Sequence, residues 1–144
     1  MPAETHISTP LPAGINEQSL INALHSHDAY VRVTCPQLIS QTHISGSPNL
    51  NEPCAYEVTD KRAMGQTTFK LTLTNVSGGV DATVEGKTPT GSMVIRSQWR
   101  VAGGNLDENV EIESNVVTKK LVKGNVEKGH PGFHQGFLTQ AAQA

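Results

Sequence analysis

The chain has 144 residues, which is enough for one compact domain spanning residues 1–144 and too few for a two-domain enzyme. Eleven Lys and Arg residues against thirteen Asp and Glu leave a formal charge of -2, which argues against nucleic acid as a partner because a basic surplus is missing. Only 36% of the residues are hydrophobic and 4% are aromatic, so we expect an aliphatic core that fills space poorly.

The sequence gives no signal for export or membrane insertion. No stretch approaches the roughly 20 apolar residues that span a bilayer, and residues 1–6 lack a positive region followed by an apolar one. The two cysteines, Cys35 and Cys54, are too few for a disulfide framework. We therefore expect a cytoplasmic protein with two free thiols and no insertion into membranes.

Two short helices are predicted near the N-terminus. Asn16 can cap a helix in which Leu20 and Leu24 share one face, and Glu17 lies in its first turn, where the helix dipole favours an acid. The next stretch, residues 28–33, is predicted as a second short helix that ends before Pro36.

From residue 38 to residue 119 the hydrophobic period is two, which is typical of strands. Residues 68–85 form a predicted hairpin, and two more alternating segments follow at 93–101 and 109–116, each after a turn that contains glycine. These four strands form a predicted antiparallel meander with one face in water. Earlier segments at about 4–9, 38–44 and 54–61 bring the expected number of strands to roughly seven.

The last segment returns to a helical period over residues 119–143. One face of this helix would carry Val122, Val126, Gly129, Phe133 and Phe137. Pro131 is expected to kink or restart the helix, since it removes a backbone hydrogen bond. The three glycines at 129, 132 and 136 form a smooth strip, where we expect a strand of the sheet to pack; room for a ligand is the alternative.

The order of strand, two helices, six strands and helix resembles the helix-grip superfamily, the START and Bet v 1-like proteins that include aromatic polyketide cyclases and small lipid carriers. The fold class implied is α+β, a roughly seven-stranded antiparallel sheet wrapped around a long C-terminal helix. The segments 24–28, 89–91, 99–101 and 129–134 look like a little-characterised branch in filamentous fungi, associated with natural-product cyclases. The resemblance implies a cavity for an apolar molecule between sheet and helix, but supplies no catalytic residue.

The candidate site residues come from the strand alternation and the helix face. Ser97 and Ser114 are polar residues on predicted inward faces, so each hydroxyl must bond the backbone or face a ligand. Tyr56 and Trp99 offer donors from inward positions, with core packing as the alternative for Trp99, and His134 is expected at the cavity mouth or on the surface. The predicted catalytic residues are Tyr56, Ser97 and His134, and the predicted substrate-binding residues are Phe69, Trp99, Ser114, Phe133 and Phe137.

Neither a metal nor another cofactor is expected. His130 and His134 have the i, i+4 spacing of helical metal ligands, but Pro131 and Gly132 lie between them and no acidic or cysteine ligand follows at a familiar distance. No phosphate loop, dinucleotide fingerprint or nucleophile elbow occurs. The carboxylates fall mostly on predicted outward faces, so no acid–base pair is visible inside the cavity.

Two functions follow from these expectations. The first is a cofactor-free cyclase of fungal terpenoid or polyketide metabolism, which folds an apolar linear precursor and includes Diels–Alder closure among its candidate reactions. The second is a non-catalytic carrier of a lipid-like small molecule. The partner in either case is an apolar small molecule, and a homodimer is compatible with the sequence.

Overall fold

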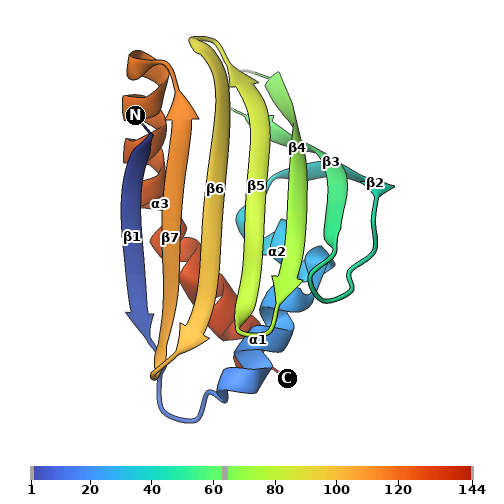
Figure 1. Ribbon diagram of the computed structural model, residues 1–144, viewed down its shortest axis with the longest axis vertical. Helices are drawn as coiled ribbons and strands as arrows, with labels where there is room; N and C mark the ends of the chain where they lie inside the picture. Colours follow the sequence, from blue (N-terminus) through green and yellow to red (C-terminus); the bar gives the residue numbers. More distant parts are fainter. Residues whose placement is uncertain (1, 63–64, 144) are drawn as a thin grey trace.

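A computed structural model describes residues 2–62 and 65–143, and it confirms the α+β helix-grip fold. In the described residues, seven strands and three helices follow one another in the predicted order (Figure 1). They are β1 (Ala3–Pro10), α1 (Glu17–His25), α2 (His27–Thr34), β2 (Leu38–Ser45), β3 (Pro53–Arg62), β4 (Gly65–Val76), β5 (Gly79–Thr88), β6 (Gly91–Ala102), β7 (Asn105–Ser114) and α3 (Val116–Ala142).

The strands form one antiparallel sheet in the order β1-β7-β6-β5-β4-β3-β2. The order follows the chain from β2 to β7, and β1 then pairs with β7, with Thr5 opposite Val110. Helix α3 crosses one face of the sheet behind β1, β7 and β6, and its C-terminal end meets α1 and α2 (Figure 1). This arrangement leaves the other face of the sheet to solvent.

The turn between β6 and β7 shows why the meander forms where the sequence predicts it. Ala102 pairs with Asn105, so Gly103 and Gly104 are the two residues of a hairpin loop. Both have positive φ, 60° and 80°, which matches the right-handed twist of the strands and which glycine adopts without strain.

The core lies between the sheet and the helices in two clusters. The larger cluster surrounds Trp99 and Phe137, both fully buried, and includes Leu20 and Leu24 of α1. The smaller cluster joins β7 to the N-terminal half of α3 through Ile112 and Val126.

Two details of the helices differ from the sequence prediction. Helix α3 begins at Val116 because the Asn115 side chain accepts a hydrogen bond from the Thr118 amide, and the helix continues through Pro131 without restarting. The glycine strip does not meet a strand: a β-carbon at Gly136 would lie 2.8 Å from Cγ1 of Val33 on α2. At Gly136, helix α3 therefore packs closely against α2.

Candidate functional site

A cavity of about 670 Å³ lies between the covered face of the sheet and α3. Its wall is largely apolar, and side chains of the sheet face side chains of the helix across it. The apolar residues that line it are Phe69, Leu71, Ala82, Val84, Met93 and Ile95 from the sheet and Val122, Val126 and Phe133 from α3. The cavity can therefore hold an apolar molecule of low molecular mass.

Gly129 lies in the helical wall of this cavity. A β-carbon at this position would have no heavy atom within 4 Å. The glycine strip therefore has two different surroundings: Gly136 packs against α2, and Gly129 leaves open space beside the cavity.

A buried carboxylate contacts a histidine that lines the cavity. Glu108 of β7 is 0% exposed, and its two oxygens contact two different imidazoles of α3. Oε2 lies 2.6 Å from His130 Nδ1, and Oε1 lies 3.1 Å from His134 Nε2. The other nitrogen of His134, Nδ1, lies 2.9 Å from the hydroxyl of Thr9, so the cluster ties α3 to both β7 and β1.

The protonation of Glu108 follows from these contacts. Burial alone would raise the pKa of the Glu108 carboxyl, but hydrogen bonds and charge from His130 and His134 outweigh burial and lower this pKa below its usual value. Glu108 is therefore an anion, which only accepts hydrogen bonds, so both imidazole nitrogens that face it carry protons.

His130 is the member of this cluster that lines the cavity. Its side chain is 16% exposed, and its Nδ1–H is held by Glu108. Among the described residues, Nε2 of His130 has no hydrogen-bond partner. The hydrogen bond to Glu108 fixes Nδ1 of His130 as a donor and leaves Nε2 available, which is the arrangement of a general base when the ring is neutral.

A second polar contact borders the same region. Trp99 Nε1 donates a hydrogen bond to the Tyr30 hydroxyl oxygen over 3.1 Å, and Tyr30 lines the cavity from α2. Burial, with a smaller contribution from the Glu108 charge, raises the pKa of Tyr30, so its hydroxyl keeps its proton. Trp99 also pairs with Glu108 across β6 and β7, which places the two polar contacts beside each other.

The residues predicted from sequence fall into three places. Phe69, Ser97 and Phe133 line the cavity. Trp99, Phe137 and His134 are all 0% exposed and do not line the cavity; the Trp99 ring contacts His134 at a tilt and Phe137 edge to face. Tyr56 and Ser114 lie elsewhere: Tyr56 is bonded to His27, and the Ser114 hydroxyl donates to the carbonyl of Ser92 at the end of β7.

The surroundings of Tyr56 explain its separation from the cavity. Its hydroxyl lies 2.8 Å from His27 Nδ1, and the Cys54 thiol donates to it over 3.2 Å. His27 Nε2 in turn lies 2.9 Å from the side-chain oxygen of Asn75, whose amide donates to the backbone carbonyls of residues 25 and 48. This buried network connects α2 to β3 and β4, so its contacts are those of a structural junction.

Glu108, His130 and Tyr30 were not among the predicted site residues. Glu108 could have been found from strand parity, because the alternation that turns Val110 and Ile112 inward also turns Glu108 inward. The i, i+4 pair of histidines on the facing helix was the second signal. The contacts of these histidines with Glu108 could not be predicted, because they depend on how α3 packs on β7.

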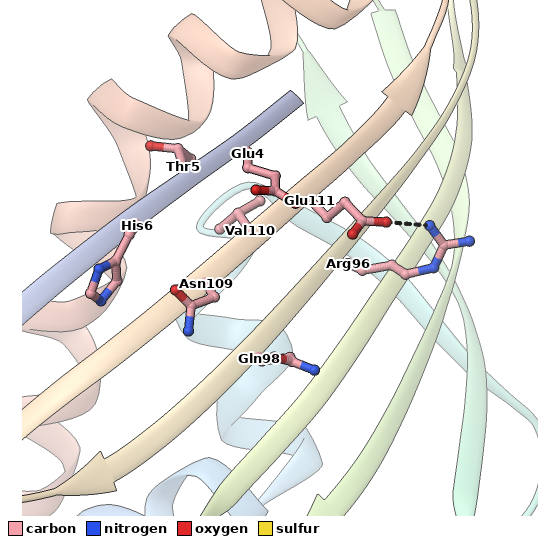
Figure 2. Close-up of a pocket in the computed structure, with 8 residues that line it drawn as sticks. All are labelled: Glu4, Thr5, His6, Arg96, Gln98, Asn109, Val110 and Glu111. Atoms are coloured by element: carbon pink, nitrogen blue, oxygen red, sulfur yellow. Dashed lines mark hydrogen bonds and ion pairs between the residues drawn. The ribbon is translucent and has the colours of Figure 1, made fainter. Parts of the chain in front are cut away.

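The opposite, solvent-facing side of the sheet carries a shallower polar hollow. Figure 2 shows Gln98, Asn109 and His6 along it, with Arg96 ion-paired to Glu111 at one end. The Arg96 Nη1 also lies 3.0 Å from Glu113. These exposed pairs form a solvated, charged surface.

Two further observations concern all the residues that the structure describes. No helix in the described residues has the length and apolar character that crossing a membrane requires. Among the same residues, no group of three or more His, Cys, Asp or Glu side chains is arranged to hold a metal ion.

Comparison with solved structures identifies the class of the fold. Ara h 8.0201 matches with a TM-score of 0.67 at 12% identity, covering 100% of this chain and 99% of that one. The Zhui aromatase/cyclase from Streptomyces sp. R1128 matches with a TM-score of 0.57 at 8% identity, covering 98% and 93%. The di-domain aromatase/cyclase StfQ of the steffimycin pathway matches with a TM-score of 0.62 at 8% identity, covering 97% of this chain and 50% of that one. The fold is thus that of the Bet v 1-like proteins and aromatase/cyclases.

The sequence itself places the chain in a family. Residues 2–143 match the family described as Domain of unknown function (DUF7053), and the chain belongs to it. Comparison with curated protein sequences finds no match.

Proposed function

We propose that this protein is a cofactor-free cyclase that closes a ring in an apolar linear precursor, a terpenoid or polyketide, in fungal natural-product metabolism. The observation that carries the proposal is the His130–Glu108 pair, whose His130 lies in the largely apolar wall of the cavity between the sheet and α3. Besides tying α3 to β7, the pair leaves Nε2 of His130 without a partner among the described residues in a side chain that lines the cavity, where it can act on a bound molecule. The fold shared with two aromatase/cyclases supports the same choice.

The proposed chemistry begins with the shape of the bound precursor. The apolar wall between the sheet and α3 holds a flexible chain in a bent conformation, which brings its reacting atoms together before the reaction starts. This contribution lowers the entropic part of the barrier and needs no polar group.

The polar contribution comes from His130. Its Nε2 takes a proton from the precursor beside an electron-withdrawing group, and the buried Glu108 charge stabilises the imidazolium that results. The electron pair of the broken C–H bond then attacks a carbonyl carbon further along the precursor, the π pair of that carbonyl moves to its oxygen, and His130 returns the proton to this oxygen. His130 is the proposed catalytic residue, and Glu108 is the positioning residue that fixes its tautomer.

This arrangement changes which ring closure is favoured. A Diels–Alder closure needs correct folding of the substrate but no base. The His130–Glu108 pair supports a closure that includes proton transfer. Positioned bases contribute about 10² to 10⁴ in rate.

The test uses the purified protein with a panel of linear precursors, namely poly-β-keto thioesters and polyprenyl compounds, and follows products by liquid chromatography and mass spectrometry. We expect one cyclised isomer to form faster than in buffer, and His130→Gln to lower its rate by at least about 10²-fold while the precursor still binds. His6→Gln is the matched control, since His6 is exposed on the solvent face of the sheet.

The outcomes separate cyclase from carrier. If a precursor binds in the cavity and is recovered unchanged at the rate seen in buffer, the protein is a carrier and the cyclase proposal fails. A rate that survives His130→Gln would assign the closure to substrate folding alone and remove His130 from the mechanism.

A further inference from the structure

Ser97 presents an unused hydroxyl to the cavity. It lies in the middle of β6, is only 5% exposed, and lines the cavity between Ala82 and Val110 on the neighbouring strands. Its hydroxyl has no hydrogen-bond partner among the described residues, and its oxygen is not one of the side-chain atoms sealed from solvent. The hydroxyl is therefore open to the cavity, where a bound molecule can accept from it or donate to it.

Tyr30 presents an unused proton to the same cavity. It is 5% exposed, and its oxygen already accepts the hydrogen bond from Trp99 Nε1. In the described part of the chain no acceptor faces the Tyr30 proton. With its oxygen engaged, the hydroxyl is left as a donor.

The strand register places these two hydroxyls on the side of the cavity where Trp99 lies. Ser97 and Trp99 lie two residues apart on the same face of β6, a separation of about 7 Å, and Tyr30 is bonded to the Trp99 ring. Glu108 stands opposite Trp99 on β7 and holds His130. Ser97, Tyr30 and His130 therefore approach one region of the cavity from β6, α2 and α3.

We propose that Ser97 and Tyr30 together bind one carbonyl oxygen of the ligand, so that the natural ligand carries a neutral ketone, aldehyde or ester group at the inner end of an apolar skeleton. The proposal rests on the proposed function for the cavity and its base, and it names the group that the cavity recognises. These two side chains favour an acceptor atom on the ligand, because Tyr30 has a free proton to donate and Ser97 can donate a second.

Beside Tyr30, the Glu108 charge favours a neutral group over an anion. The buried Glu108 carboxylate acts electrostatically on Tyr30, and it would repel a carboxylate or phosphate held at the same place. A neutral carbonyl avoids this repulsion. It also places the carbon beside the carbonyl, whose protons are acidic, in the region that His130 approaches.

The test compares two rigid apolar probes of the same shape, fluorenone, which has a carbonyl, and fluorene, which has a methylene group in its place. We expect Ser97→Ala to weaken fluorenone binding by about fivefold and to leave fluorene binding unchanged, since one hydrogen bond contributes about 1 kcal/mol. The carbonyl stretch of bound fluorenone should lie at lower frequency in the natural protein than in Ser97→Ala. Thr59→Val is the control, because it removes a buried hydroxyl that does not line the cavity.

Tyr30→Phe provides the second variant, and a thermal melt shows whether the loss of the hydrogen bond from Trp99 Nε1 unfolds this variant. If Tyr30→Phe is unfolded, Ser97→Ala remains decisive, because it breaks no described hydrogen bond. Equal effects of Ser97→Ala on the two probes, or none on either, would overturn the carbonyl site and leave the proposed function standing. If the natural protein binds neither probe, the apolar cavity itself fails as a binding site, and both proposals fall.

Discussion

Replacing Glu108 by Gln tests the buried cluster on which the proposed site depends. The substitution keeps the size of the side chain and removes its charge. In the natural chain the carboxylate accepts from His130 at 2.6 Å and from His134 at 3.1 Å. The amide of Gln can accept from only one imidazole, because its nitrogen is a donor and faces the N–H of the other.

The cost can be worked from the lost contact. A hydrogen bond to a charged group contributes about 1.5 to 3 kcal/mol, and the variant loses one such bond and weakens the second. Removing a buried charge recovers part of its desolvation cost. We therefore expect Glu108→Gln to lower the free energy of unfolding by about 2 kcal/mol at pH 7, which corresponds to roughly 6 °C in Tm for a domain of this length.

The assay is urea unfolding followed by the fluorescence of Trp99, the single tryptophan, which is fully buried. The pH dependence gives the sign. Because the folded pKa of Glu108 is lowered from its usual 4.5, its ionisation stabilises the fold above pH 4.5, and this contribution is lost as pH falls below that value. The difference between natural protein and variant should therefore shrink below pH 4.5. Equal stability at pH 7, or a difference independent of pH, would refute the reasoning.

Three other results are expected. Gly129→Ala should stabilise the protein by up to about 1 kcal/mol, since alanine has the higher helix propensity and no atom lies within 4 Å of the new methyl group. Gly136→Ala should destabilise the protein, because its methyl group would lie 2.8 Å from Cγ1 of Val33. Thermal melts of the two variants measure both effects. Tyr56→Phe should cost about 1 to 2 kcal/mol in urea unfolding and leave the affinity for fluorenone unchanged, and a change in that affinity would place Tyr56 in the binding site. Burial lowers the pKa of His27 from its usual 6.5, so stability should begin to fall as pH drops below 6.5, and His27→Gln should remove this step.

The fold could be predicted because its signals are local. Alternation with a period of two specified the strands and the inward faces of Phe69 and Ser97, and paired glycines specified the turn after Ala102. The glycine strip was misassigned to a strand, because sequence shows that a face is smooth without showing which element packs there. The sequence predicted a helix over residues 119–143 that Pro131 would kink or restart; α3 continues through Pro131 without a restart, since tertiary packing can hold a helix that local propensity disfavours.

The site could be predicted only in part because its key contacts are long-range. Glu108 and His130 are 22 residues apart, and Tyr56 meets His27 from 29 residues away. Strand parity shows that Glu108 points inward, but it cannot show that the His130 imidazole lies against it. The phase of α3 decided between its two histidines: His134 is sealed behind the wall, and His130 lines the cavity.

The most direct test of the central claim, that His130 acts as a base inside an apolar cavity, is the ring opening of 5-nitrobenzisoxazole, a flat apolar compound that reacts when a base removes its C–H proton. The coloured phenolate product is followed by absorbance with natural protein, His130→Gln and the control His6→Gln. We predict acceleration over buffer that is retained in His6→Gln and falls by at least about 10²-fold in His130→Gln. A natural protein no faster than buffer, or a rate that His130→Gln leaves unchanged, would contradict the account.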